Sequence, residues 1–257
     1  MAPRVIPAPG VLPDYKRDAR EAFECLKAGG VIIIPTETGY GITSASNEGI
    51  DRCFRAKERR EGHTLGVIGT FNTFKQLNEV SPGKVEMVRV ITQDMGQLIN
   101  TVAPMKKGHP RLAHLTPENL ARVTRRDTIG INIGESPFMR ELGRLNDDDG
   151  QLLVGSSANI TGTGQKLRVE DIEPQVYEAA DLVVDYGLQR YHRYQRSGTI
   201  LDLETMKIYR IGAGYELLRD RIKKWWGYEL EEDPDYKTDR VGVSHSIMTK
   251  DAQAAYQ

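Results

Sequence analysis

The segment from Gly29 to Ile42 constrains the fold most, because it joins a fully apolar run directly to a polar run that contains glycine. Val31–Ile34 is apolar and mostly β-branched, which favours a buried strand, and we expect this strand to stop at Pro35. Thr36–Thr38 follow at once. Loops at the ends of buried strands commonly carry ligand-binding groups. The segment therefore predicts a strand that presents polar side chains to a site, although an ordinary strand and turn would fit the same residues.

Size and charge narrow the class of protein. The chain has 257 residues and a formal net charge of −1, so it can hold one large α/β domain or two small ones, with no bulk attraction to nucleic acid or membrane. No apolar run approaches the roughly 18 residues that span a bilayer. Cys25 and Cys53 are too few for a disulfide framework or a four-cysteine metal site. We therefore expect a reducing, cytoplasmic location.

Helical and strand patterns alternate along the chain. Apolar residues recur at helical spacing in 14–28, 83–104 and 169–180, whereas Thr128–Ile133 alternates as a half-buried strand. A solvated turn is expected at 147–150. The alternation favours an α/β fold with a mixed sheet.

The two ends of the chain differ in composition from its middle. Residues 1–13 contain several prolines, which suggests an extended arm. From residue 228 the chain is charged and then poor in apolar residues, so we expect a mobile tail over 228–257. The folded, catalytic domain is therefore expected over residues 14–227.

Polar clusters follow or connect several of the expected strands. Besides Thr36–Thr38 they are Lys57–Arg60, Ser156–Asn159, the pair Ser197 and Thr199, and the cation Arg210. Cations, hydroxyl groups and strand-end amides together suit a polyphosphate. A regular helix would not point Lys57 and Arg59 the same way, so they could converge only if the helix ends near Lys57. Lys57–Arg60 could instead be an ordinary charged helix end, and Ser156–Asn159 an ordinary serine-rich turn.

Other well-known site patterns are missing from the sequence. There is no Walker-type glycine loop, and Gly162–Gly164 is too short for a dinucleotide fingerprint. Asn159 breaks the G-x-S-x-G pattern of a nucleophile elbow. The five histidines form no zinc-binding spacing. We therefore expect no metal bound by protein side chains.

Five motifs in order resemble those of the YrdC-like family, whose best-known members are the threonylcarbamoyl-AMP synthases. Gly29–Ile42 resembles G-G-x-x-x-x-P-T-E-T-x-Y-G-L, Arg55–Leu65 resembles A-K-x-R-P…P-L, Ser157–Gly162 resembles S-A-N-x-S-G, Gly198–Leu203 resembles S-T-V-V-D-L, and Tyr209–Gly212 resembles L-R-P-G. The similarity covers about residues 15 to 225. It implies a twisted mixed sheet with flanking helices around a positively charged cavity.

The resemblance also implies a reaction and its ligands. ATP would be cleaved to AMP and pyrophosphate, with bicarbonate and an amino acid or other amine as co-substrates. Lys57 and Arg59 would be catalytic, and both would bind ATP together with Ser157, Asn159 and Arg210. Magnesium is expected from the nucleotide chemistry and not from any ligand motif. Catalysis would consist mostly of positioning and charge neutralisation.

The departures from the family pattern cluster on the amino-acid side. The family's carboxylate-binding arginine matches Asn132, its usual histidine matches Ile68 or Gly69, and the serine before Thr199 is Gly198. An amide cannot replace a bidentate guanidinium for a carboxylate. Five residues would line the changed pocket: Thr36, Asn132, Ser156, Ser197 and Thr199. We therefore expect activation of a carbamate, or a related carboxylate, from a substrate other than L-threonine.

Two other functions stay open. The chain could be an orthodox L-threonylcarbamoyl-AMP synthase of tRNA modification, or a non-catalytic protein that binds a nucleotide or RNA, including double-stranded RNA. The basic residues of 190–196, interleaved with Tyr191 and Tyr194, are the best candidate for an RNA contact, though a solvated loop or a lid over the nucleotide would also explain them. The sequence predicts no membrane partner and leaves the acceptor and the oligomeric state undefined.

Overall fold

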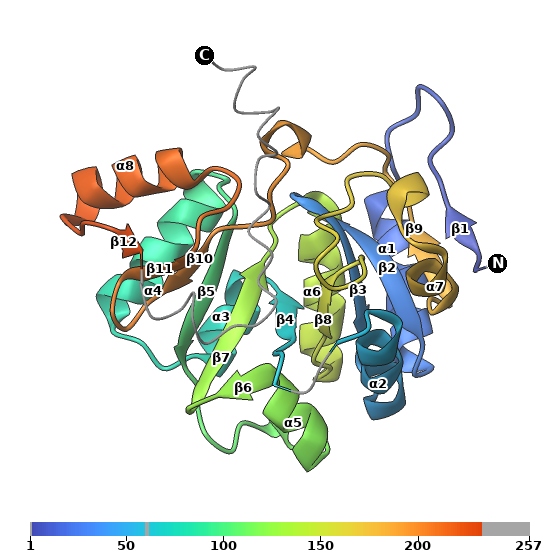
Figure 1. Ribbon diagram of the computed structural model, residues 1–257, viewed down its shortest axis with the longest axis horizontal. Coiled ribbons are helices and arrows are strands. Elements are labelled where there is room, and N and C mark those ends of the chain that lie inside the picture. Colours follow the sequence, from blue (N-terminus) through green and yellow to red (C-terminus); the bar gives the residue numbers. More distant parts are fainter. Residues whose placement is uncertain (1, 60–61, 233–257) are drawn as a thin grey trace.

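A computed structural model describes residues 2–59 and 62–232 and has a single mixed sheet as its framework (Figure 1). Within these residues twelve strands follow the order β1-β9-β2-β3-β8-β4-β7-β5-β10-β11-β12, with β6 beside β7. Their bounds are β1 (Arg4–Val5), β2 (Val31–Thr36), β3 (Gly39–Ser44), β4 (Gly66–Gly69), β5 (Ile99–Pro104), β6 (Thr124–Arg125), β7 (Thr128–Ile133), β8 (Val154–Ser157), β9 (Leu182–Val184), β10 (Ile200–Asp202), β11 (Lys207–Arg210) and β12 (Glu231–Glu232). The expected α/β fold with a twisted mixed sheet is confirmed.

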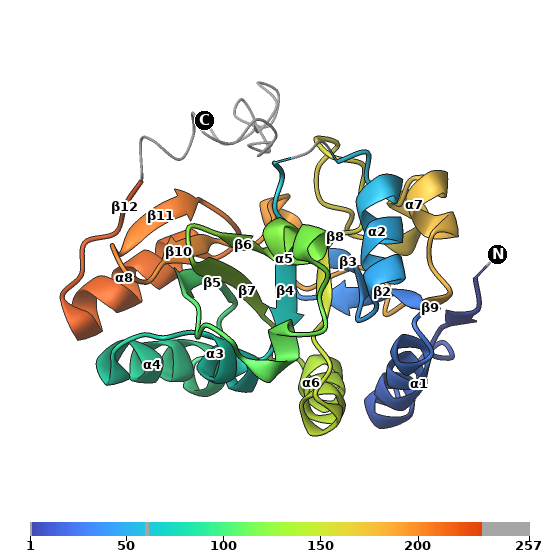
Figure 2. The same ribbon diagram turned by 90° about the horizontal axis from the view of Figure 1, so that it is seen from below.

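Helices flank the sheet on both sides. They are α1 (Tyr15–Lys27), α2 (Asn47–Ala56), α3 (Phe71–Leu77), α4 (Pro82–Arg89), α5 (Pro117–Val123), α6 (Pro137–Asp149), α7 (Pro174–Glu178) and α8 (Tyr215–Trp226). In Figure 2, α1, α3, α4 and α6 lie below the strands, whereas α2 and α7 lie above β2 and β3. The largest core cluster joins the inner faces of α3, α4 and α8 to β4, β5 and β7. None of the helices in the described part is long and apolar enough to cross a membrane.

The segment from Gly29 to Ile42 forms most of a hairpin of β2 and β3. β2 continues through Pro35 to Thr36, and β3 returns beside it with Pro35 opposite Tyr40. The expected strand end at Pro35 is therefore wrong. Proline has no N–H to donate to a neighbouring strand. The N–H of Tyr40 donates to the Lys166 carbonyl at 2.9 Å and not to Pro35, so Pro35 and Tyr40 form a pair that exchanges no hydrogen bond, and a proline can stand there.

Three further expectations of local structure are corrected. The expected helix over 83–104 ends early: α4 passes into a π-helix (Val90–Asp94), Gly96 has φ of 57°, and 99–104 forms β5. Pairing with β7 and β10 on its two sides overrides the helical spacing there. Pro174 divides the expected helix over 169–180 into a 3-10 turn and α7. The expected turn at 147–150 is the last turn of α6, which ends at Gly150.

Both ends of the described chain pair with the sheet. β1 lies beside β9, where Arg4 contacts Asp185, and β12 lies beside β11, next to the buried Leu230. The arm and the first residues of the expected tail therefore make ordered contacts. The rest of the expected tail, 233–257, lies outside the described residues.

Candidate functional site

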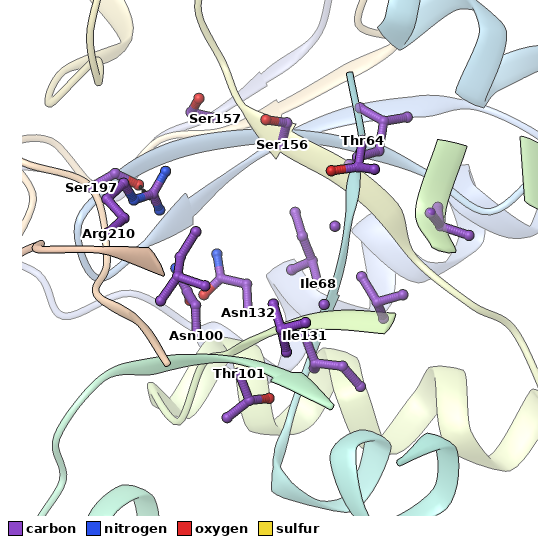
Figure 3. A pocket seen from close by; sticks show the side chains of 18 of the residues that line it. Thr64, Ile68, Asn100, Thr101, Ile131, Asn132, Ser156, Ser157, Ser197 and Arg210 are labelled. Carbon is purple, nitrogen blue, oxygen red and sulfur yellow. Dashed lines mark hydrogen bonds between the residues drawn. The ribbon is translucent and has the colours of Figure 1, made fainter. Parts of the chain in front are cut away.

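A cavity of about 160 Å³ lies between β8 and β4 on one side and β5, β7 and β11 on the other (Figure 3). Polar and apolar residues from strands far apart in the sequence line it: Thr64, Leu65, Gly66, Val67, Ile68, Asn100, Thr101, Val102, Val123, Arg125, Thr128, Gly130, Ile131, Asn132, Gly155, Ser156, Ser157, Ser197, Ile200 and Arg210. Five of the residues expected at the site are among them: Asn132, Ser156, Ser157, Ser197 and Arg210.

The floor of the cavity follows from strand register. Ile68 of β4 is level with Asn132 of β7, Asn132 with Asn100 of β5, and Asn100 with Ile200 of β10. Asn132 alternates with isoleucines of the largest core cluster and so points to the opposite face, where the cavity lies. These four residues form one row across four strands, in which the two amides lie between two isoleucines.

A β-bulge brings Arg210 to the end of this row. Leu201 is level with Ile208, but Ile200 is level with Arg210, so β11 gains one residue on β10. Ile208 packs in the core, and simple alternation would turn Arg210 to the same face. Bulges redirect side chains, and this one places the guanidinium at the cavity. Its Nη2 donates to Ser197 Oγ at 3.1 Å and to the Gly198 carbonyl at 2.9 Å.

Arg59, in the loop that follows α2, does not itself line the cavity but contacts two residues that do, Thr64 and Ser156. The helix ends at Ala56 with Lys57 as its cap, which is the ending that the sequence analysis required. Arg59 Nη2 donates to Ser156 Oγ at 2.6 Å, and Nη1 donates to the Thr64 carbonyl. Its Nε is buried without a hydrogen-bond partner among the described residues.

The two arginines bring unbalanced positive charge. Burial and then the charge of Arg210 lower the pKa of Arg59 to about 10, and burial lowers the pKa of Arg210 to about 10. Both stay protonated at neutral pH. Every hydrogen-bond partner that the described residues offer to these guanidinium groups is a neutral oxygen. Such an arrangement suits an anion.

Lys57 is not among the residues that line the cavity. Its side chain is only 1% exposed, and its ammonium donates to the carbonyl oxygens of Ser157 and Asn159. Burial and the charge of Arg59 lower the pKa of Lys57 well below its ordinary value. Asn159 is also buried and donates to the Ile160 carbonyl at 2.5 Å. Both side chains shape the loop behind Ser157 instead of lining the cavity.

Thr36 and Thr199 also lie outside the cavity lining. Thr36 Oγ1 donates to the Gly39 carbonyl at 2.7 Å and closes the β2–β3 turn. Thr199 is fully buried, and its Oγ1 accepts the Gly212 N–H at 3.1 Å. In this structure their hydroxyl groups hold turns that carry neighbouring site residues.

The sequence analysis missed Asn100, which faces Asn132. Because a helix was expected over 83–104, Asn100 was not assigned to the face of a strand. The available signal was the alternation of Ile99, Thr101 and Ala103, which leaves Asn100 on the other face of a strand.

Glu37 lies in the β2–β3 turn. Burial and then the nearby Glu135 raise the pKa of its carboxyl group to about 7, against the opposing effects of Arg190 and Arg140. The backbone carbonyl of Glu37 accepts the N–H of Tyr191 at 3.1 Å, which ties this turn to the basic loop.

The basic loop over 190–196 packs partly on itself. The rings of Tyr191 and Tyr194 lie 6.0 Å apart, and the Arg190 guanidinium lies 5.4 Å from the Tyr191 ring centre. Tyr194 is 41% exposed. RNA binding by this loop stays a prediction.

Comparison with known families identifies related sequences. A family model for the Sua5, YciO and YrdC proteins, described as "Telomere recombination", matches residues 24–212. The threonylcarbamoyl-AMP synthase of Pseudoalteromonas translucida is 28% identical over 193 residues, which are 74% of this chain and 95% of that protein. The YciO protein of Escherichia coli K12 is 21% identical over 216 residues, which are 77% of this chain and 91% of that protein.

Solved structures share the fold. Sua5 of P. abyssi complexed with L-threonine has a TM-score of 0.69 at 19% identity over 90% of this chain. The match covers 62% of that longer protein. The E. coli YciO structure has a TM-score of 0.58 at 20% identity, covering 79% of this chain and 91% of that one.

Proposed function

Because this chain belongs to the Sua5/YciO/YrdC family, we propose that it is an ATP-dependent enzyme that forms an acyl adenylate from a carbamate. An amine and bicarbonate would condense to the carbamate with loss of water. A carbamate carboxylate oxygen would then attack the α-phosphorus of ATP, and the bond to pyrophosphate would break. No covalent bond to the protein is required, so positioning and charge stabilisation account for catalysis.

The pair of partly buried arginines without acidic partners is the observation that carries this proposal. Arg210 lines the cavity beside the Ser197 hydroxyl group, and Arg59 donates to two residues of the cavity lining, Thr64 and Ser156. A triphosphate supplies the negative charge that both guanidinium groups lack. Ser157 would contribute from the end of β8.

Lys57 and Asn159 would act on the nucleotide from behind this surface. The Lys57 ammonium binds the carbonyl oxygens on either side of Ala158 and so fixes the end of β8. Within the described residues no three His, Cys, Asp or Glu side chains gather as a metal site. Mg²⁺ would therefore be held mainly by the phosphates.

The acceptor is proposed to be an amine other than L-threonine. Asn132 stands on the cavity floor and is uncharged, so it offers no cation to an amino-acid carboxylate. The competing function is an orthodox threonylcarbamoyl-AMP synthase of tRNA modification. The names of the relatives and the L-threonine complex of P. abyssi Sua5 favour it.

Pyrophosphate release tests the proposal directly. The protein is incubated with ATP, Mg²⁺ and bicarbonate, together with L-threonine, other amino acids or simple amines. We expect bicarbonate-dependent release with an amine other than L-threonine, and no release from Arg210→Gln. Efficient turnover of L-threonine would support the orthodox synthase. Binding of ATP or RNA without turnover of any amine would support a non-catalytic protein.

A further inference from the structure

Two facing carboxamides on the cavity floor have no part in the proposed nucleotide contacts. Asn100 and Asn132 are directly opposite each other on the antiparallel strands β5 and β7, and Figure 3 shows them side by side. Opposite residues of such strands have Cβ atoms about 5 Å apart. Both amides can therefore contact the same small group.

Asn100 carries an unused acceptor. The residue is only 9% exposed, yet its Oδ1 has no hydrogen-bond partner among the described residues. Buried polar atoms in folded proteins are nearly always paired, so this oxygen requires a donor from outside the fold. A carboxylate has no proton to donate at neutral pH and would be repelled by it.

Gly198 makes room for the Asn100 amide. A Cβ atom at position 198 would lie 2.6 Å from Asn100 Nδ2, which is closer than a real contact allows. The Gly198 carbonyl accepts two hydrogen bonds from Arg210 at 3.0 and 2.9 Å, which hold this backbone in place. The amide therefore lies against a fixed backbone without a side chain.

The surroundings of the two amides limit the ligand. Ile68 and Ile200 flank the amides in the same register row, so no charged side chain lies next to them within it. Arg210 lies beyond Ile200 in this row, so the part of the ligand that contacts the amides is neutral, whereas another part can carry the negative charge that the arginines require.

We propose that Asn100 and Asn132 recognise a carboxamide or ureido group on the acceptor amine. Such a group supplies an N–H to the Asn100 oxygen and a carbonyl to an amide N–H, and paired donor and acceptor contacts of this kind are typical of asparagine. This assignment rests on the proposed function, because it names the acceptor class of the same site.

L-threoninamide and L-threonine are matched probes, since they differ only in the carboxamide. Calorimetric titration of the full chain with each, in the presence of Mg²⁺ and α,β-methylene-ATP, measures the preference. We expect L-threoninamide to bind at least tenfold more tightly. Asn100→Ala should weaken it at least tenfold, whereas Asn72→Ala, on the exposed face of α3, should leave it unchanged.

A second variant guards against a folding defect in Asn100→Ala. Gly198→Ala leaves the amide in the chain but displaces it from the cavity, so it should cause a similar loss. Equal or tighter binding of L-threonine, no binding of either probe, or full binding by both variants would overturn the assignment.

Titrating the probes also without the ATP analogue separates this inference from the proposed function. Asn100-dependent binding of L-threoninamide to a protein that does not bind the analogue supports the carboxamide site and rejects the adenylation function. Binding of the analogue without discrimination between the probes rejects the carboxamide site alone.

Discussion

Arg59 and Arg210 are each expected to lower the free energy of unfolding of the ligand-free protein. Each arginine is partly buried, which lowers the pKa of its guanidinium, and the charge of Arg210 lowers the pKa of Arg59 further. Buried cations without acidic partners weaken a fold, so they are retained where a ligand neutralises them. Their effect on ligand binding should therefore be opposite in sign to their effect on stability.

Arg210→Gln tests this opposition. We expect its affinity for an ATP analogue to fall about 10- to 100-fold, because charge-assisted hydrogen bonds contribute roughly 1.5 to 3 kcal/mol. The ligand-free variant should be as stable as the unmodified protein or up to about 1 kcal/mol more stable, since relief of repulsion offsets or outweighs the lost hydrogen bonds. Calorimetry and urea unfolding measure the two quantities. Arg20→Gln on the exposed side of α1 is the control, and unchanged affinity of Arg210→Gln would contradict the proposed nucleotide site.

Glu37 gives a prediction about pH. Burial raises the pKa of its carboxyl group from an ordinary 4.5 to about 7, so the folded state binds this proton more tightly than the unfolded state. Its contribution to stability is full below about pH 4.5 and is lost as pH rises through 7. Glu37→Gln should therefore be more stable than the unmodified protein at pH 8.5, by at most about 2 to 3 kcal/mol, and similar at pH 4.5.

Thermal unfolding at the two pH values checks this prediction. The exposed Glu79→Gln serves as control and should show no such divergence. An equal effect of Glu37→Gln at both pH values would show that the carboxyl group is not perturbed as described.

At the scale of elements, close strand packing sets the shape of the cavity. β8 pairs with β3 on one side and β4 on the other, and Gly155 lies in its centre and in the cavity lining. A Cβ atom there would lie 2.2 Å from the Ile42 carbonyl oxygen, which is backbone and cannot rotate away. The bulge in β11 similarly belongs to a pair of strands and not to Arg210 alone.

Gly155→Ala should destabilise the protein by about 2 to 4 kcal/mol, because β3 or β8 must shift to accept the methyl group. Gly83→Ala is the matched control. A Cβ atom at Gly83 of α4 meets nothing within 4 Å, and alanine favours a helix, so this change should stabilise by about 0.5 to 1 kcal/mol. Urea unfolding of both variants is the measurement. Equal stability of the two would contradict the packing of β8.

At the scale of the whole molecule, the proposed site joins both halves of the sheet. Arg59 follows α2, Ser156 lies near the end of β8, and Arg210 ends β11 near the far edge of the sheet. A ligand that contacts all three connects segments that are distant in the sequence. Its binding should therefore stabilise the entire domain.

ATP with Mg²⁺ at about 100 times its dissociation constant should add roughly 2.7 kcal/mol to the free energy of unfolding. For a domain of this size that raises Tm by roughly 5 to 10 °C. Differential scanning fluorimetry measures the shift, and Arg210→Gln should lose about half of it or more. The same shift in Arg210→Gln would place the nucleotide elsewhere.

Local patterns predicted much of the fold. Periodic apolar residues predicted α1 and the alternation of β7 within a few residues. The helical prediction failed at 99–104, because strand pairing outweighs local spacing. The five motifs indicated the family, which the family model confirms.

The sequence by itself determined the chemistry that is available: two arginines, several hydroxyl groups and an uncharged Asn132 in segments that end strands. Only the tertiary structure decided which of these groups meet. Strand register set Asn100 opposite Asn132, a one-residue bulge turned Arg210 into the cavity, and burial directed Lys57 to the carbonyl oxygens behind Ser157. Register and bulges depend on contacts between strands that lie far apart in the chain, so no local pattern of residues can specify them.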